Sequence, residues 1–221
     1  MDFPVVVGPM EKGKRILESF NTIKRPDFLQ FEGPTCARCG TILSDDITER
    51  MDVHGIKYCP ICILGDVHPN ANPQRLTEIE SPQQIRNMIL DTFGSPPENS
   101  QTENAPLPGA YILWSPPLPE EHLADQMGIV QRLGSLYVKI LSATNGNGLI
   151  YVGQSQDVAS RVWSQIRGEG ALLTTFMPPS RLVAVDWKAP NMGYEKLENE
   201  VGRQVADAIE ANGYDIEVYW N

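Results

Sequence analysis

The chain has 221 residues, of which 41% are hydrophobic and 21% are charged, as in soluble globular proteins. Its net charge of −10 is shared evenly, because residues 1–106 carry 10 Lys and Arg against 15 Asp and Glu and residues 107–221 carry 8 against 13. This balance argues against bulk electrostatic coating of nucleic acid, which needs clustered cations. No membrane span or secretory signal is predicted, so we expect a cytoplasmic location, or a nuclear one in a eukaryote.

Residues 1–33 are expected to form an amino-terminal extension. Residues 34–66 hold all four cysteines, as Cys36-Ala-Arg-Cys39 and Cys59-Pro-Ile-Cys62, with nineteen residues between the pairs. Two thiolates on each of two tight knuckles bind opposite sides of Zn²⁺, so this spacing predicts a structural zinc module. Buried free thiols or disulfides are the alternatives. The module resembles a zinc ribbon or a treble clef.

Residues 67–93 are predicted to connect this module to the next domain. The loop "DVHPNANPQR" (66–75) leads into them, and a helix that Ser81 caps and Pro82 begins follows. Residues 94–106 have the composition of a linker, rich in proline and polar residues with little to bury.

Residues 107–221 predict an α+β domain with a small mixed or antiparallel sheet flanked by helices. The predicted elements are a strand in "LPGAYILW", a helix over 119–134, a β-hairpin of "SLYVKIL" and "LIYVG", a helix over 157–167, a strand in "SRLVAVDW", a helix over 191–211 and a last strand in "YDIEVYW".

One carboxylate of the helix over 191–211 falls on its apolar side. Glu198 lies inside the arc of apolar residues, whereas Glu195 is at its border and Glu200 is well outside it. A buried carboxylate needs a partner or a metal ion to offset the cost of its desolvation. In the alternative, the helix rolls and Glu198 reaches solvent at the edge.

The segment "LIYVGQSQDVASRV" supplies two further polar groups beside a strand end. Tyr151 alternates with its apolar neighbours, and Gly153 leaves room for a substrate backbone where the strand stops. On the helix that follows, Arg161 flanks the apolar stripe and Arg167 faces solvent. A tyrosine, an arginine and a glutamate suit phosphodiester hydrolysis, in which Glu198 holds Mg²⁺ or Mn²⁺, Arg161 offsets developing charge and a tyrosine relays a proton.

These residues resemble the GIY-YIG nuclease family, found in excision-repair, restriction and homing endonucleases. "YVGQSQDVASRV" is similar to the family pattern from Tyr151 to Arg161, and "GYEKLENE" is similar to the helix of the metal-binding glutamate, here Glu198. The resemblance covers about residues 107–217. It implies a single-metal endonuclease acting on duplex or branched DNA, with Gly153 and Ser155 near the substrate.

Two tyrosines are candidates for the tyrosine of the first family signature. "PGAYILW" fits the motif and selects Tyr111, whereas the predicted hairpin selects Tyr137. The chain also departs from the family, because no histidine follows Arg161 and Asp215 stands where a late asparagine is expected.

The sequence therefore leaves three hypotheses. The first is an endonuclease whose zinc module positions the substrate or recruits a protein partner or a second copy. The second is a degenerate binding module of the same fold that acts through protein contacts. The third is a zinc-stabilised structural protein, which requires Arg161 and Glu198 to lie far apart.

Overall fold

The computed structural model describes residues 33–97, 105–119, 121 and 134–220. The chain divides into two units, Met1–Pro34 and Thr35–Asn221, and every element below belongs to the second. The predicted amino-terminal extension, much of the linker and nearly all of the helix predicted over 119–134 lie outside the described residues. Within the described ranges, no helix combines the length and the hydropathy needed to cross a membrane.

A five-stranded mixed sheet forms the centre of this unit, with strand order β3-β6-β4-β5-β7. Strand β7 runs parallel to β5, and the other neighbours are antiparallel. The strands are β3 (Gln74–Arg75), β4 (Gly109–Ser115), β5 (Leu149–Ser155), β6 (Arg181–Trp187) and β7 (Glu217–Tyr219). The predicted α+β class with a small sheet is confirmed, although Gln74–Arg75 was predicted as loop and is instead an edge strand.

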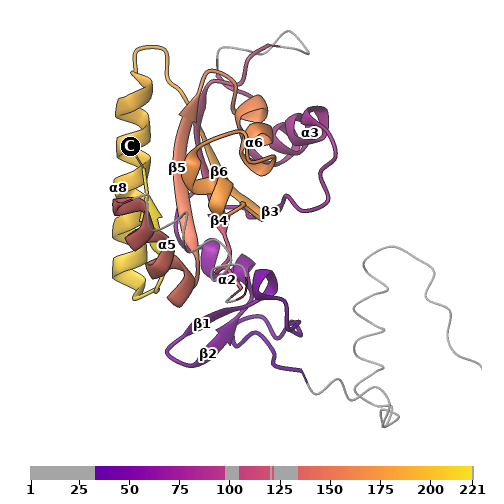
Figure 1. Ribbon diagram of the computed structural model, residues 1–221. Helices are drawn as coiled ribbons and strands as arrows, with labels where there is room; N and C mark the ends of the chain where they lie inside the picture. The colour runs from indigo at the N-terminus through magenta and orange to yellow at the C-terminus, as the bar shows by residue number, and fades with distance from the viewer. Residues whose placement is uncertain (1–32, 98–104, 120, 122–133, 221) are drawn as a thin grey trace, which may run out of the picture. The chain divides into compact units, whose positions relative to one another are not determined.

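Helices cover both faces of the sheet, as Figure 1 shows. The long helix α8 packs against β4 and β5 on one face, while α3 and α6 pack on the other. The alternation of side chains along β4 explains the two cores, since Tyr111 and Leu113 belong to one and Ile112 and Trp114 to the other. The helices are α3 (Pro82–Phe93), α5 (Ser135–Asn145), α6 (Val158–Ile166), α7 (Leu172–Phe176) and α8 (Tyr194–Asn212).

Local sequence signals explain where the main helices begin and end. Ser81 caps α3 in a capping box with Gln84, and Pro82 takes the first helical position. Helix α8 ends where Gly213 adopts a left-handed conformation, with φ of 66°. The predicted helices at these places are confirmed to within a few residues.

The predicted β-hairpin before β5 was wrong. Residues Ser135–Asn145 form α5, which buries Ile140 and Ala143 against the same core as Tyr111 and Tyr151. The β-forming residues of "LYVKIL" suggested a strand, but burial of a helical face decided the outcome. The antiparallel partner of β5 is β4, along its full length from Gly109 to Ser115.

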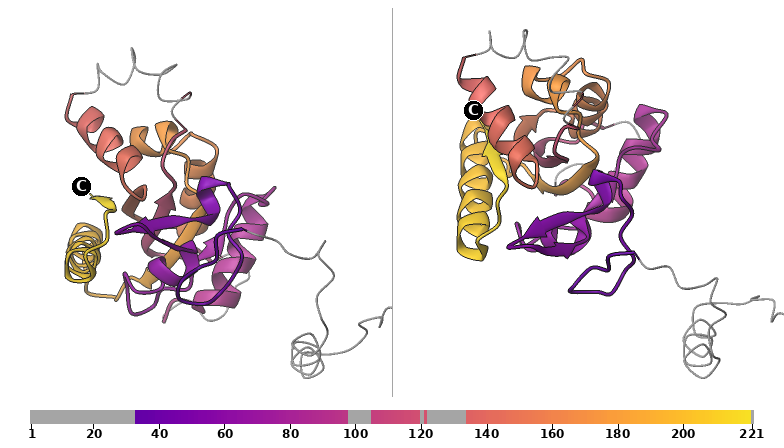
Figure 2. Two further views of the ribbon diagram at one scale, coloured as in Figure 1. Left: turned by 90° about the horizontal axis from the view of Figure 1, so that it is seen from below. Right: turned by 60° about the horizontal axis from the view of Figure 1, so that its bottom comes forward.

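The cysteine-containing segment packs at one end of the sheet (Figures 1 and 2). It contains the 3-10 helix η2 (Ile47–Glu49), the hairpin of β1 (Met51–Val53) and β2 (Ile56–Tyr58), and helix α2 (Pro60–Leu64). Met51, Ile63 and Leu64 are buried in the core that also contains Trp114. The segment therefore shares a hydrophobic core with the sheet.

Asn147 joins this segment to the sheet by two hydrogen bonds. Its Oδ1 accepts from the backbone N–H of Asp52 at 2.6 Å, and its Nδ2 donates to the carbonyl of Asp52 at 2.5 Å. The amide thus pairs with strand β1 as a neighbouring backbone would. Asn147 is buried, and its own carbonyl accepts from Trp114 Nε1.

Candidate functional site

The four cysteine thiols lie together and could hold a metal ion such as zinc. All four sulfur atoms are within 4.8 Å of one another, and Cys39 Sγ and Cys59 Sγ are 3.6 Å apart. Tetrahedral zinc with Zn–S bonds of about 2.3 Å requires sulfur separations of about 3.8 Å. The donor set and its spacing therefore fit structural zinc, with no place left for a substrate ligand.

Two backbone features shape the cysteine pairs. In the first knuckle, Gly40 donates to the carbonyl of Cys36 at 2.8 Å and has φ of 74°, which favours glycine. The second pair begins α2, with Cys59 at its N-cap and Pro60 at its first position. Burial is the main cause that raises the pKa of the Cys62 thiol, and hydrogen bonding with the other three thiols raises it further. Such a shift is expected where thiols crowd together without a cation.

Arg38 ties the first knuckle to the rest of the unit. It donates to the carbonyl of Cys62 at 2.8 Å and forms an ion pair with Asp66. Tyr214, which follows α8, donates to the same carboxylate at 2.8 Å. The hydrogen bond from Arg38 is the main influence that lowers the pKa of Asp66.

A second polar cluster surrounds two tyrosines on the central strands. Tyr111 of β4 lies directly opposite Gly153 of β5, and the Tyr111 and Tyr151 rings are 6.3 Å apart. Both side chains are buried. A Cβ atom at Gly153 would lie 2.5 Å from Tyr111 Oη and 2.8 Å from Tyr151 Cε1. The space that was predicted to admit a substrate backbone at Gly153 is therefore filled by these two rings.

Gln165 holds the Tyr111 hydroxyl and was missed by the sequence analysis. Its Nε2 donates to Tyr111 Oη at 3.1 Å, while its Oε1 accepts from the backbone N–H of Ala171 at 2.8 Å and from Thr174 Oγ1. Gln165 is fully buried, one helical turn beyond Arg161. A polar residue on the apolar side of α6 was the available signal, because a buried amide needs partners.

Arg161 and Glu198 approach the same two tyrosines. Burial raises the pKa of both Tyr111 and Tyr151, and the positive charge of Arg161 opposes this shift at each hydroxyl. The negative charge of Glu198 raises the pKa of both tyrosines further. Glu198 is only 4% exposed, whereas Glu195 and Glu200 on the same helix are exposed, in agreement with the helical periodicity.

The other predicted site residues lie as follows. Tyr137 is on helix α5, partly buried beside the core of Tyr111, and does not occupy a strand. The hydroxyl of Ser155 bonds to the carbonyl and the N–H of Asp157, so it serves the turn into α6. Arg167 is exposed and pairs with Glu169. Asp215 lies beside Gly146, near the opposite end of β5 from Gly153.

The structure therefore places Tyr111 and Tyr151 side by side, and the charges of Arg161 and Glu198 both act on their hydroxyls. The tyrosines come from the sheet, Arg161 from α6 and Glu198 from the first turns of α8. Comparison of this chain with protein-family models, with curated proteins and with solved structures gave no match.

Proposed function

We propose that this protein is a metal-dependent endonuclease of the GIY-YIG type that hydrolyses phosphodiester bonds in DNA. The observation that carries the proposal is the convergence of Arg161 and Glu198 on Tyr111 and Tyr151. The pattern of "YVGQSQDVASRV" and of "GYEKLENE" supports the same assignment. Tyr111, in a strand and opposite Gly153, is the better candidate for the first-strand tyrosine than Tyr137.

In this proposal each residue has a distinct role. Arg161 offsets the negative charge that develops on the phosphate. The tyrosines hold their protons at neutral pH, as the ordinary tyrosine pKa of about 10 already ensures and burial raises it further, so they can donate hydrogen bonds to the attacking or leaving oxygen. Glu198 provides one carboxylate ligand, and bound Mg²⁺ or Mn²⁺ supplies charge stabilisation at the phosphate.

Among the described residues, no group of three or more metal-ligating side chains surrounds Glu198, and only the four cysteines form such a group. Glu198 would therefore act as a lone protein ligand, and phosphate and water oxygens would complete the shell. The cysteine module would position the substrate or a partner. Its order of knuckle, hairpin and helix favours a treble clef over a zinc ribbon.

Cleavage of supercoiled plasmid DNA tests the proposal. Full-length, zinc-loaded protein with Mg²⁺ or Mn²⁺ should nick the plasmid, and Glu198→Gln or Arg161→Gln should reduce the rate by about 100-fold or more. Glu200→Gln and Arg167→Gln are matched controls, because both residues are exposed on the same two helical segments. Absence of nicking across linear, supercoiled and branched DNA contradicts the proposal, as does activity that survives Glu198→Gln.

The burial of the cluster favours one alternative, a binding module without catalysis. Tyr111 is 1% exposed and Glu198 is 4% exposed, so a scissile phosphate can reach them only if neighbouring groups move. Titration with Mn²⁺ separates the two functions. An endonuclease should bind Mn²⁺ in a manner that Glu198→Gln abolishes, whereas a binding module should take up zinc alone.

A further inference from the structure

A small polar cavity lies where the cysteine module meets the edge of the sheet. Its volume is about 160 Å³, and it is lined by residues of the η2 segment, by Arg75 of β3 and by Ser180 and Arg181 at the start of β6. This is well below the about 300–1,000 Å³ of pockets for drug-sized ligands. The cavity can therefore hold only a small group.

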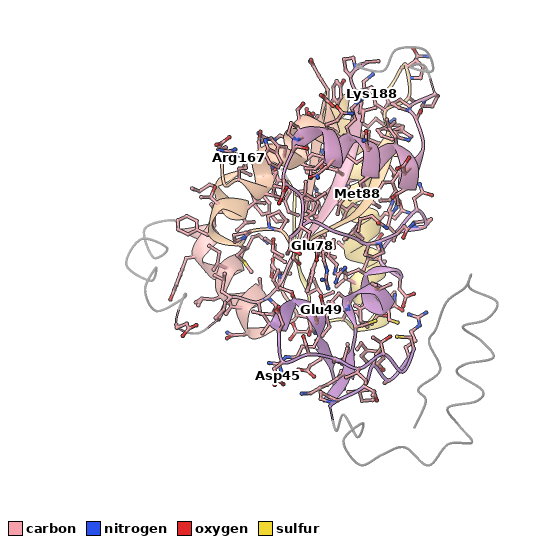
Figure 3. The ribbon with its side chains drawn as sticks, turned by 90° about the vertical axis from the view of Figure 1, so that its right-hand side faces the viewer. Asp45, Glu49, Glu78, Met88, Arg167 and Lys188 are labelled. Carbon is pink, nitrogen blue, oxygen red and sulfur yellow. The ribbon has the colours of Figure 1, made fainter. Side chains whose placement is uncertain are left out.

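Two arginines meet at this cavity. Arg75 and Arg181 are opposite each other in the β3–β6 pairing, and both contact the same carboxylate oxygen of Glu49, Arg181 at 3.4 Å. Arg181 is only 5% exposed. In Figure 3, side-chain nitrogen atoms gather between the labels of Glu49 and Glu78. Glu49 Oε1 thus occupies the position that an oxyanion oxygen would take between two guanidinium groups.

Two buried polar atoms at the cavity lack partners. Within the described part of the chain, neither Arg181 Nε nor Ser180 Oγ has a hydrogen-bond partner. The Nε and Nη2 edge of a guanidinium forms a fork that binds two oxygens of one oxyanion. In Arg181 only the Nη2 side of this fork meets Glu49, at a long distance, so the fork and the Ser180 hydroxyl together form an incomplete oxyanion site.

The segment that carries Glu49 is short and lies near the surface. Helix η2 has three residues and none of them is buried, and the Glu49 side chain is 30% exposed. If Glu49 swings out, the lining keeps Arg75 and Arg181 against Asp46, a net charge of +1, while the exposed Glu78, outside the lining, pairs with Arg75 at 3.5 Å. Burial, and then the charge of Arg75, lowers the pKa of Arg181, as expected for a cation that its surroundings do not fully stabilise.

We propose that this cavity is an oxyanion site for a single phosphoryl group, which displaces Glu49 and is held by Arg75, Arg181 and Ser180. The site is separate from the tyrosine cluster. In the register of β4 with β6, Arg181 lies opposite Trp114, whereas Tyr111 lies opposite Val185, further along β6. It does not depend on the proposed endonuclease activity. The phosphoryl group comes either from free phosphate or from a nucleic-acid backbone.

Calorimetric titration of the full-length, zinc-loaded protein with inorganic phosphate, without divalent cations and at fixed ionic strength, tests the site. Arg75→Gln should weaken phosphate binding by about tenfold or more, and Glu49→Gln should strengthen it by a similar factor. Arg75 is half-exposed, so its loss leaves the core intact. Arg167→Gln, at an exposed arginine with its own acidic partner, is the matched control and should bind as the wild type does.

Competition by an oligonucleotide distinguishes the two sources of the phosphoryl group, and the phosphate titration itself decides whether the site exists. If a short oligonucleotide without terminal phosphate competes with inorganic phosphate in the wild type but not in Arg75→Gln, the group is a backbone phosphate. If phosphate binds and the oligonucleotide does not compete, the site takes the free ion. Absence of phosphate binding in both the wild type and Glu49→Gln overturns the proposal, as does equal binding in Arg75→Gln and the wild type.

Discussion

The hydroxyl of Tyr111 occupies the space that a side chain at Gly153 would fill. A Cβ atom at Gly153 would lie 2.5 Å from Tyr111 Oη and 2.6 Å from Tyr111 Cζ. Both positions are buried in a packed core, so the ring cannot simply turn away. We expect Gly153→Ala to lower the free energy of unfolding by about 1–3 kcal/mol, measured by urea denaturation.

Gly193→Ala is the control for that substitution. A Cβ atom at Gly193 would meet nothing within 4 Å, although alanine is a weaker N-cap for α8 than glycine. It should therefore cost less than Gly153→Ala. Equal stability losses in the two variants would show that the packing of Tyr111 against Gly153 is unimportant.

The contact between Tyr111 and Gly153 also shows which features could be predicted from the sequence and which could not. Strand β5, helix α6 and the burial of Glu198 follow from periodicity and from turn residues, and the structure contains all three. The role of Gly153 does not follow, because it depends on which strand lies beside β5. Local propensity suggested "SLYVKIL" as that partner, but β4 takes the position and carries Tyr111 opposite Gly153.

The roles of Gln165 and Asn147 could not be predicted from the sequence either, because they depend on residues of other elements. Each is a buried amide with a partner far away in the sequence, Tyr111 for Gln165 and the backbone of Asp52 for Asn147. Sequence patterns place a residue on the face of its own element but do not identify what packs against that face. The cysteine cluster was predictable because metal-ligand spacing is itself a local pattern.

Removal of the metal should destabilise the whole unit of Thr35–Asn221. Cys59→Ser should lose zinc, and because Ile63 and Leu64 share a core with Trp114, we expect a loss of at least about 4 kcal/mol. Ile61→Ala, which alters an exposed residue between two of the cysteines, is the control and should retain about one zinc ion per chain. Zinc content and thermal unfolding are the measurements. Full zinc occupancy and an unchanged melting temperature in Cys59→Ser would exclude this site.

Asn147→Ala should loosen the β1–β2 hairpin from the sheet. The substitution removes both hydrogen bonds to Asp52, and we expect a cost of about 1–3 kcal/mol, because two partly buried backbone groups lose their partner. Hydrogen exchange should accelerate in residues 51–58 more than in β4 and β6. Asn145→Ala changes an exposed neighbour and should leave exchange unchanged. Uniform acceleration across the sheet would show that Asn147 stabilises the fold as a whole and does not specifically hold this hairpin.

The buried tyrosines should make the protein less stable in alkali. Burial raises the pKa of Tyr111 and Tyr151, and burial with the neighbouring Asp66 raises the pKa of Tyr214 to about 12. Below the ordinary tyrosine pKa of about 10, both the folded and the unfolded states hold these protons, so the contribution to stability is fully present. Above it the unfolded state releases protons that the folded state keeps, and stability falls as pH rises toward the raised values.

Tyr111→Phe should therefore make the alkaline loss of stability shallower, by up to about 1.4 kcal/mol per pH unit. Urea denaturation from about pH 8 to about pH 11 measures this slope, and the other groups cancel when variant and wild type are compared. Gln165→Leu provides the opposite comparison, because its hydrogen bond lowers the pKa of Tyr111 and its loss should raise that pKa further. That variant should release the Tyr111 proton at a higher pH than the wild type, as followed by phenolate absorbance. A slope in Tyr111→Phe equal to that of the wild type would mean that Tyr111 ionises in the folded state as it does in the unfolded chain.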